Sequence, residues 1–512
     1  MSKKSTDAQN VNGINTSEQT KETDKGGGFK LNVKRTTYIG MAFFTIMMLW
    51  QVYNTYCPLF LNDFFVSKLG GTASDHAYLV GIIMAMDNIF ALFMLPLFGA
   101  LSDKTKSKLG KRMPYIMIGV IMAVIIFPLI PVLFIYDQMI WMIVTMALIL
   151  LAMNVYRSPA VALMPDITPK PLRSKANAII NVIGYVGAIF AGVLAMVFQA
   201  KNGVDGRLIY NADTIWVPFA LTAFFMILAL VILLLKIREN KLALELKDDM
   251  ERGEKVADTA EIIEEDKPLT GINKRNMIVL LISIFLWFFA FNAIETFGST
   301  FGVQVLEQSS GWWGIAVIVM TICSLIGFFP GAFLADKIGR RNTVIIGLGI
   351  MLLALAIAMF TLPSWAYFPL VGIAGVGWAW VNVNSYPMVV EMASKKNIGK
   401  LTGWYYAASM LAQSITPICM GFLFGVLGYQ FMFPYATIFT VIALAVFLFY
   451  IPSKKTDDMI VGKVGFLENK AKLANDSEEK LIHLTPEVIA RQEKLKNKPK
   501  RKRKTKKDSE IK

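Results

Sequence analysis

The chain has 512 residues, of which 55% are hydrophobic and only 17% are charged. A soluble domain carries about 25% charged residues, so this composition excludes an ordinary soluble enzyme and predicts burial in lipid. About half of the formal net charge of +15 lies in the segment 453–512 and most of the rest in short loops. That distribution excludes a nucleic-acid-binding domain and is typical of a protein that faces an anionic membrane leaflet.

The chain divides into polar ends and a long apolar middle. Residues 1–35 are rich in Ser, Thr, Asn, Lys and Gly, which predicts a disordered tail. Beyond them, runs of about 20 apolar residues predict spanning helices. These runs lie near residues 37–62, 77–101, 114–136, 139–164, 176–199, 213–236, 276–302, 312–335, 341–362, 365–391, 401–425 and 431–452.

The sequence therefore predicts an all-α membrane protein with twelve transmembrane helices. Two bundles of six helices occupy residues 36–236 and 276–452, a polar loop joins them at 237–275, and a basic tail follows at 453–512.

The positions of lysine and arginine predict the orientation in the membrane. They are frequent in four of the predicted loops, near residues 104–112, 170–175, 337–341 and 395–400, whereas the opposite loops hold only Lys68, Lys201 and Arg207. Because positively charged loops stay on the cytoplasmic side, we expect both termini and the central loop to be cytoplasmic. We expect a multi-pass protein of the plasma membrane.

The two predicted bundles repeat a short motif. After the second helix the chain reads Gly99-Ala-Leu-Ser-Asp103-Lys-Thr, followed by Gly110-Lys111-Arg112. After the eighth helix it reads Gly331-Ala-Phe-Leu-Ala-Asp336-Lys-Ile-Gly339-Arg340-Arg341. A repeat of half the chain length with one orientation is typical of a transporter built from two bundles around a central cavity.

An acidic residue followed by Gly-Lys-Arg or Gly-Arg-Arg in these loops resembles the signature of the major facilitator superfamily. The lengthened first loop, 102–115, and the segment 157–166 resemble the glycoside–pentoside–hexuronide:cation symporters, in particular their sucrose-transporter-like branch. The resemblance covers residues 37–452. It implies alternating access, with a sugar bound between the bundles, a proton or a sodium ion as the driving cation, and no other cofactor.

Three charged residues lie well inside the predicted spans: Asp87, Arg157 and Glu295. A charge at this depth costs about 2.5–3.5 kcal/mol on insertion scales, so each needs a partner or a function. Melibiose-type members of the family carry two acids on the second helix, where this chain has Ala91 and Leu95. The candidate ion-coupling residues are therefore Asp87 and Arg157; a permanent pair that holds two helices together is the alternative.

Polar side chains recur on single faces of several predicted helices. Amides can satisfy sugar hydroxyls and aromatic faces can cover the C–H surface of a sugar ring, so we expect these residues to bind substrate, with helix-to-helix packing as the alternative. The predicted substrate-binding residues are Gln51, Asn54, Asn154, Asn181, Asn292, Glu295, Trp378 and Asn382.

The charges of the repeated loops, with two acids at the inner ends of the fourth and tenth helices, predict salt bridges that hold the cytoplasmic side closed. Solvated loop charges are the alternative. This predicted cytoplasmic gate consists of Asp103, Arg112, Asp166, Asp336, Arg340, Arg341 and Glu391.

Together these features predict a secondary active transporter and not an enzyme. The expected activity is symport of a sugar, a disaccharide or glycoside such as sucrose or maltose, with a proton. A proton-coupled drug or organic-cation exporter of the same fold is the alternative. The expected partners are the sugar and the lipid bilayer, with no nucleic acid and no metal site, and the expected state is a monomer.

Overall fold

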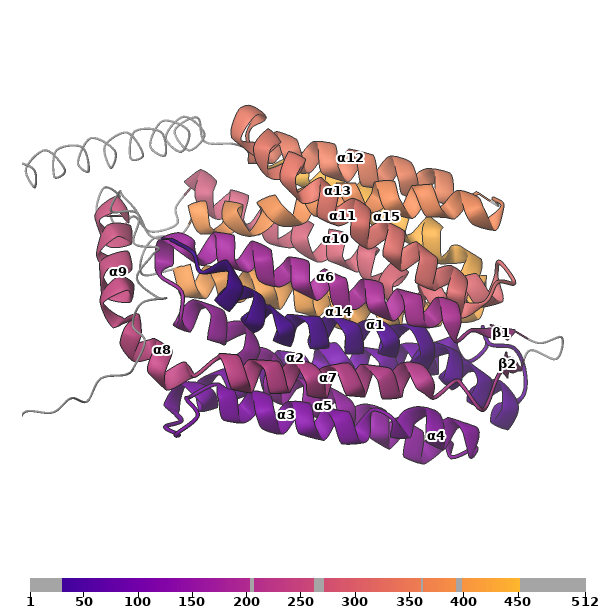
Figure 1. Ribbon diagram of the computed structural model, residues 1–512. Coiled ribbons are helices and arrows are strands. Elements are labelled where there is room, and N and C mark those ends of the chain that lie inside the picture. The colour runs from indigo at the N-terminus through magenta and orange to yellow at the C-terminus, as the bar shows by residue number, and fades with distance from the viewer. Residues whose placement is uncertain (1–29, 203–206, 262–270, 361, 393–397, 452–512) are drawn as a thin grey trace, which may run out of the picture. The chain divides into compact units, whose positions relative to one another are not determined.

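The computed structural model describes residues 30–202, 207–261, 271–360, 362–392 and 398–451, and these belong to one compact unit. Most of the predicted N-terminal tail and the whole basic tail lie outside the described residues. Within the unit the long helices run alongside one another (Figure 1). The short hairpin β1–β2 lies at one end of them, and helices α8 and α9 lie at the other.

The elements of the first half are α1 (Val33–Leu69), α2 (Ala77–Lys104), α3 (Met113–Ile126), α4 (Leu129–Ile135), α5 (Met139–Asp166), η1 (Lys170–Leu172), α6 (Arg173–Val197), β1 (Ala200–Asn202), β2 (Leu208–Tyr210) and α7 (Val217–Lys236). Then follow α8 (Glu239–Glu245) and α9 (Lys247–Glu261). The second half comprises α10 (Gly271–Gln304), α11 (Ser310–Ile338), α12 (Arg340–Ala358), η2 (Ser364–Ala366), α13 (Tyr367–Glu391), α14 (Ile398–Leu427), η3 (Tyr429–Phe431) and α15 (Met432–Leu448).

Eleven helical segments of the described chain are long and apolar enough to cross a membrane. Helix α1 is not among them, because polar residues such as Gln51 and Asn54 lower its hydropathy. It nevertheless runs beside α6 from Gly40, which faces Ile183, to Tyr56, whose hydroxyl donates to the Phe198 carbonyl 2.7 Å away. Helix α1 therefore supplies the twelfth predicted span, and its polar residues are tolerated because the middle of the helix is buried.

Three local features differ from the sequence prediction. The third span is interrupted between α3 and α4, where Pro128 cannot donate a helical hydrogen bond. The predicted central loop contains α8 and α9. Between α6 and α7, β1 and β2 form a short antiparallel hairpin in which Lys201 pairs with Ile209, so the fold is helical apart from this one pair of strands in the described chain.

The two halves meet along three helix pairs: α1 with α10, α2 with α14, and α6 with α11. Two of these contacts are close because glycine leaves room for the neighbouring backbone. A Cβ atom on Gly81 would overlap the Pro417 carbonyl oxygen, and one on Gly314 would overlap that of Gly192. Both contacts lie toward the end of the helices that carries the hairpin, which we call the outer end; the end with the basic loops is the inner end.

Hydrogen bonds between the halves also lie in the middle and at the outer end. The Ser299 hydroxyl donates to the Thr55 carbonyl at 2.7 Å, and the Tyr429 hydroxyl donates to Asn62 at 3.0 Å. The β-hairpin adds a further link, because the Ala200 N–H donates to the Ser310 hydroxyl of α11 at 3.0 Å.

The helices α5, α13 and α14 differ from these pairs. In the part of the chain that the structure describes, α5 makes no extensive packing with α13 or α14. The side chains of Tyr386 on α13 and Tyr406 on α14 are 37% and 53% exposed. The contacts between the halves that are named above therefore lie in the middle of the helices and at their outer end.

Candidate functional site

The three charges of the spanning helices come together at the seam between the halves. Arg157 on α5 interacts electrostatically with Asp87 on α2 and with Glu295 on α10. Glu295 in turn interacts with both of the other charges. We call these three residues the charge centre. It joins the predicted coupling pair to a residue that the sequence pattern assigned to sugar binding.

The charge centre is not closed by direct bonds. Among the described residues, no hydrogen bond or ion pair joins Asp87 to Arg157, and one buried carboxylate oxygen of Asp87 has no partner at all. Asp87 is only 6% exposed. The Arg157 guanidinium instead lies over the ring of Trp50, 4.6 Å from its centre, and its Nη1 atom also lacks a partner. Buried polar atoms without partners are costly, so this arrangement favours binding of a cation or a polar solute.

Tyrosines surround the charge centre. Tyr53 on α1 interacts with Asp87, Tyr156 and Tyr406 interact with Arg157, and Tyr185 on α6 interacts with Glu295. Tyr406 was missed by the sequence analysis, because Tyr405 and Tyr406 are neighbours in an apolar helix and show no helical spacing. Its side chain is 53% exposed and interacts electrostatically with Arg157 of the other half.

The predicted amides are mostly engaged within their own helices. Gln51 donates weakly to Thr55 at 3.5 Å, and Asn181 donates to the Asn177 carbonyl at 2.8 Å. Asn154 is fully buried; its amide nitrogen donates to the Leu150 carbonyl at 2.9 Å, while its oxygen has no partner.

The other predicted substrate residues have varied surroundings. Asn54 is buried on α1, and Asn382 is half-buried on α13. Asn292 is buried and accepts a bond from Thr296 at 3.4 Å.

Trp378 is the aromatic residue of the predicted substrate-binding set, and other aromatic rings cover its ring. Its ring lies parallel to that of Phe291, with centres 4.0 Å apart, and Phe288 meets it edge-on at 5.0 Å. The side chain is 9% exposed. Trp50, held against Arg157, is better placed than Trp378 to present an aromatic face at the seam.

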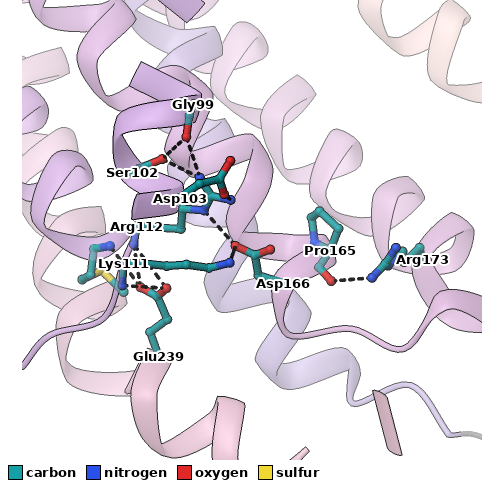
Figure 2. A network of polar contacts seen from close by, with 10 residues as sticks. Gly99, Ser102, Asp103, Lys111, Arg112, Pro165, Asp166, Arg173 and Glu239 are labelled. Atoms are coloured by element: carbon teal, nitrogen blue, oxygen red, sulfur yellow. Dashed lines mark hydrogen bonds and ion pairs between the residues drawn. The ribbon is translucent and has the colours of Figure 1, made fainter. Parts of the chain in front are cut away.

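The first repeated loop is held by a dense network around Arg112 (Figure 2). The Arg112 side chain is 5% exposed and bonds to Asp103, to Asp166 at 2.8 Å, to the Ser102 hydroxyl, and to the Gly99 carbonyl at 3.1 Å. All of these groups belong to α2, α5 or the loop itself, so the network stabilises the first half from within.

Glu239, at the start of α8, completes this network and was missed in the sequence, where it lay in the predicted central loop. Its carboxylate accepts hydrogen bonds from the backbone N–H groups of Lys111, Arg112 and Met113 at 3.0–3.2 Å. These N–H groups open α3 and have no partners inside the helix, so the buried carboxylate caps it. Figure 2 shows Glu239 reaching the loop from below, with Asp166 to the right of Arg112.

The second repeated loop is held differently. Arg340 forms an ion pair with Glu391 at the end of α13, and Arg341 donates to the carbonyls of Tyr450 at 2.7 Å and Leu448 at 3.2 Å. Among the described residues, Arg341 therefore contacts backbone carbonyls at and just after the end of α15 and forms no ion pair. Asp336 belongs to α11, but its side chain lies outside the part of the structure that is described.

The family model of the Major Facilitator Superfamily matches residues 39–328 and 307–469. The chain belongs to this superfamily. No curated protein sequence matches it.

Solved structures of the superfamily share its fold. A D-xylose–proton symporter is 16% identical with a TM-score of 0.60, covering 83% of this chain and 98% of that chain. A point mutant of the nucleoside transporter NupG is 13% identical with a TM-score of 0.57, covering 82% and 100%. A bacterial homologue of the human lysosomal transporter Spinster, inward-facing and unoccupied, is 16% identical with a TM-score of 0.59, covering 85% and 99%.

These matches confirm the predicted major facilitator fold and show that the protein is a multi-pass membrane transporter and not an enzyme. For a superfamily transporter, a charge centre shared between the two halves can respond to their relative movement, because Glu295 belongs to one half and Asp87 and Arg157 to the other. The inner loops, by contrast, lie each within one half.

Proposed function

We propose that the protein is a sugar:proton symporter of the plasma membrane that works by alternating access, with a disaccharide or glycoside such as sucrose or maltose as substrate. The observation that carries the proposal is the buried Asp87 carboxylate, with an unpartnered oxygen beside Arg157 at the seam of a superfamily transporter. A proton or a sodium ion on Asp87 removes the cost of this unpartnered charge. The similarity to a D-xylose–proton symporter agrees with the proposal at the level of the fold.

In this mechanism the cation and the sugar occupy the same seam. Asp87 takes up the cation, and Arg157 is then free to donate its planar set of N–H groups to sugar hydroxyls. The predicted amides line the helices on both sides: Gln51, Asn54, Asn154 and Asn181 in the first half, and Asn292 and Asn382 in the second. Trp50 supplies the aromatic face.

The inner loops act as the cytoplasmic gate. The bonds of Arg112 stay within the first half, and the pair of Arg340 with Glu391 stays within the second. Each network keeps its helix ends together, so that the two halves can close on each other as units when the transporter turns outward.

A proton-coupled exporter of drugs or organic cations is the second candidate. The exposed ring of Tyr406 on α14 and the carboxylate of Glu295, which both interact with Arg157, favour it, because aromatic faces and a carboxylate attract organic cations.

Uptake into proteoliposomes with an imposed pH gradient tests the proposal. We expect radiolabelled sucrose, maltose or another glycoside to accumulate when the outside is acidic. Asp87→Asn should abolish accumulation, a loss of about tenfold or more, while sugar exchange without a gradient persists. The exposed outer residue Asp137 offers a matched control, since Asp137→Asn leaves the seam intact. Gradient-driven uptake by Asp87→Asn would contradict the assignment, and efflux of organic cations without sugar accumulation would favour the exporter.

A further inference from the structure

The charge centre contains two acids and one base. Asp87 and Glu295 each contribute a negative charge, and Arg157 contributes one positive charge. In the described part of the spanning helices, the neighbours that interact with these charges are tyrosines, which are neutral in their protonated form. With both acids ionised, the centre therefore carries one uncompensated negative charge.

We propose that Glu295 is a second coupling carboxylate and that the charge centre takes up one monovalent cation in each transport cycle. The proposal rests on the proposed symport function and specifies how many cations are transported in each cycle. It assigns Glu295 a different role from the sugar contact that its helical pattern predicted.

The surroundings of Glu295 separate it from its polar neighbours on α10. Thr296 donates to Asn292 within α10, and Ser299 donates to the Thr55 carbonyl of α1, so these side chains already have hydrogen-bond partners. Glu295 has no hydrogen bond or ion pair with another described residue. It is half-buried and interacts electrostatically with Asp87 and Arg157 across the seam. The Glu295 carboxylate is therefore not fully covered by protein, and its charge interacts with the charges of the other half.

One cation is the number that the charges require. An unbalanced charge is costly at the depth of the hydrocarbon region, whereas a balanced set of two acids, one arginine and one cation is neutral overall. Arg157 can compensate only one carboxylate at a time, so the other must take the cation. Glu295 moves with the second half, so the carboxylate that Arg157 compensates changes as the halves move. Cation release is thereby linked to the change between the inward-facing and outward-facing states.

The charge count requires a monovalent cation but does not distinguish a proton from a sodium ion. The test therefore has two arms, a proton gradient and a sodium gradient. In wild-type proteoliposomes the reversal potential of substrate-driven current gives the ratio of cation to neutral sugar. We expect a ratio of one with whichever gradient drives uptake. A ratio of two would overturn the proposal, and this measurement needs no variant.

Glu295→Gln removes the uncompensated charge. We expect a loss of gradient-driven accumulation of about tenfold or more, with sugar exchange within about threefold of wild type. Glu295→Asp, which keeps the carboxylate, should retain accumulation. Glu245→Gln on the exposed face of α8 is the matched control. If Glu295→Gln accumulates sugar as wild type does, or loses sugar binding together with exchange, Glu295 is not a coupling residue. If the wild type itself concentrates no sugar under either gradient, the proposed symport function fails instead.

Discussion

The two inner loops repeat the same residue types but are stabilised in different ways. The Arg112 side chain is 5% exposed and forms ion pairs with two acids, Asp103 and Asp166. The Glu239 carboxylate caps α3, the helix that follows. Arg340 in the second half is 29% exposed and pairs with one acid, Glu391. Within the described chain, Arg341 binds carbonyl groups at and just after the end of α15.

The difference comes from the segment after the last helix of each half. After α7 the chain turns into α8 and returns a carboxylate to the first loop, whereas the described chain after α15 offers backbone carbonyls. A repeated motif therefore does not guarantee repeated contacts, and substitutions at matched positions of the two loops should have unequal effects.

Arg112→Ala should have the largest effect. Removal of one member of a buried charge network costs about 3–5 kcal/mol, and Asp166 then keeps only its ion pair with Lys111. Arg340→Ala should cost less, since its network is partly exposed, and should slow turnover more than it weakens sugar binding. Thermal unfolding in detergent, with sugar affinity and exchange rates, measures both. Equal loss of stability in the two variants would contradict the comparison, and a large loss of affinity with normal turnover in Arg340→Ala would contradict the gating role.

Glu239→Ala should destabilise the first half by about 2–4 kcal/mol, because three N–H groups at the start of α3 lose a charged acceptor. Glu239→Gln keeps one acceptor oxygen and should cost about half as much. Glu245→Ala, on the same short helix but 53% exposed, is the control. Melting temperatures of the purified variants decide the matter: if Glu239→Ala is as stable as the control, the cap contributes nothing.

The glycines of the two loops provide a closer comparison, since both have a positive φ, +120° at Gly110 and +84° at Gly339. Alanine is strained at both positions, by about 1–3 kcal/mol. At Gly110 its Cβ would also overlap the Glu239 carboxylate. Gly110→Ala should therefore lower the melting temperature more than Gly339→Ala. In a Glu239→Ala background the two substitutions should become alike; a persistent difference would show that the clash with Glu239 is not its cause.

Arg341→Ala should have the smallest effect, about 1 kcal/mol, because its side chain binds two carbonyls near the surface and pairs with no acid among the described residues. Arg341→Lys should restore part of this loss. A destabilisation as large as that of Arg112→Ala would mean that Arg341 has a charged partner.

The spans could be predicted from the sequence because transfer into lipid depends on local hydropathy, which each apolar run displays by itself. The charges at depth, Asp87, Arg157 and Glu295, could be found for the same reason, since they stand out in apolar helices. Their grouping could not be predicted, because it depends on which faces of α2, α5 and α10 meet. Trp378 shows the limit of reasoning by residue type: its ring suits a sugar, but Phe291 covers it.

Glu239 could not be found from composition either, because a polar loop residue gives no sign that it will cap a helix 128 positions away from it in the chain at Lys111. The same holds for Tyr406, whose interaction with Arg157 joins residues far apart in the chain. Local patterns predict where the chain crosses the membrane, whereas contacts between distant segments decide which side chains work together.

The hairpin at the outer end has a consequence for the timing of transport. Its first strand bonds to Ser310 of the second half, while its second strand donates the Leu208 N–H to Asp63 of the first half at 2.6 Å. When the outer ends part, at least one of these bonds must be exchanged for water, at about 1 kcal/mol each. The hairpin thus opposes the separation of the outer ends. A disulfide between cysteines introduced in place of Gln199 and Gly311 would keep these ends together, because a Cβ atom on residue 311 would lie 3.0 Å from the Gln199 side chain. The protein would then be accessible from one compartment only.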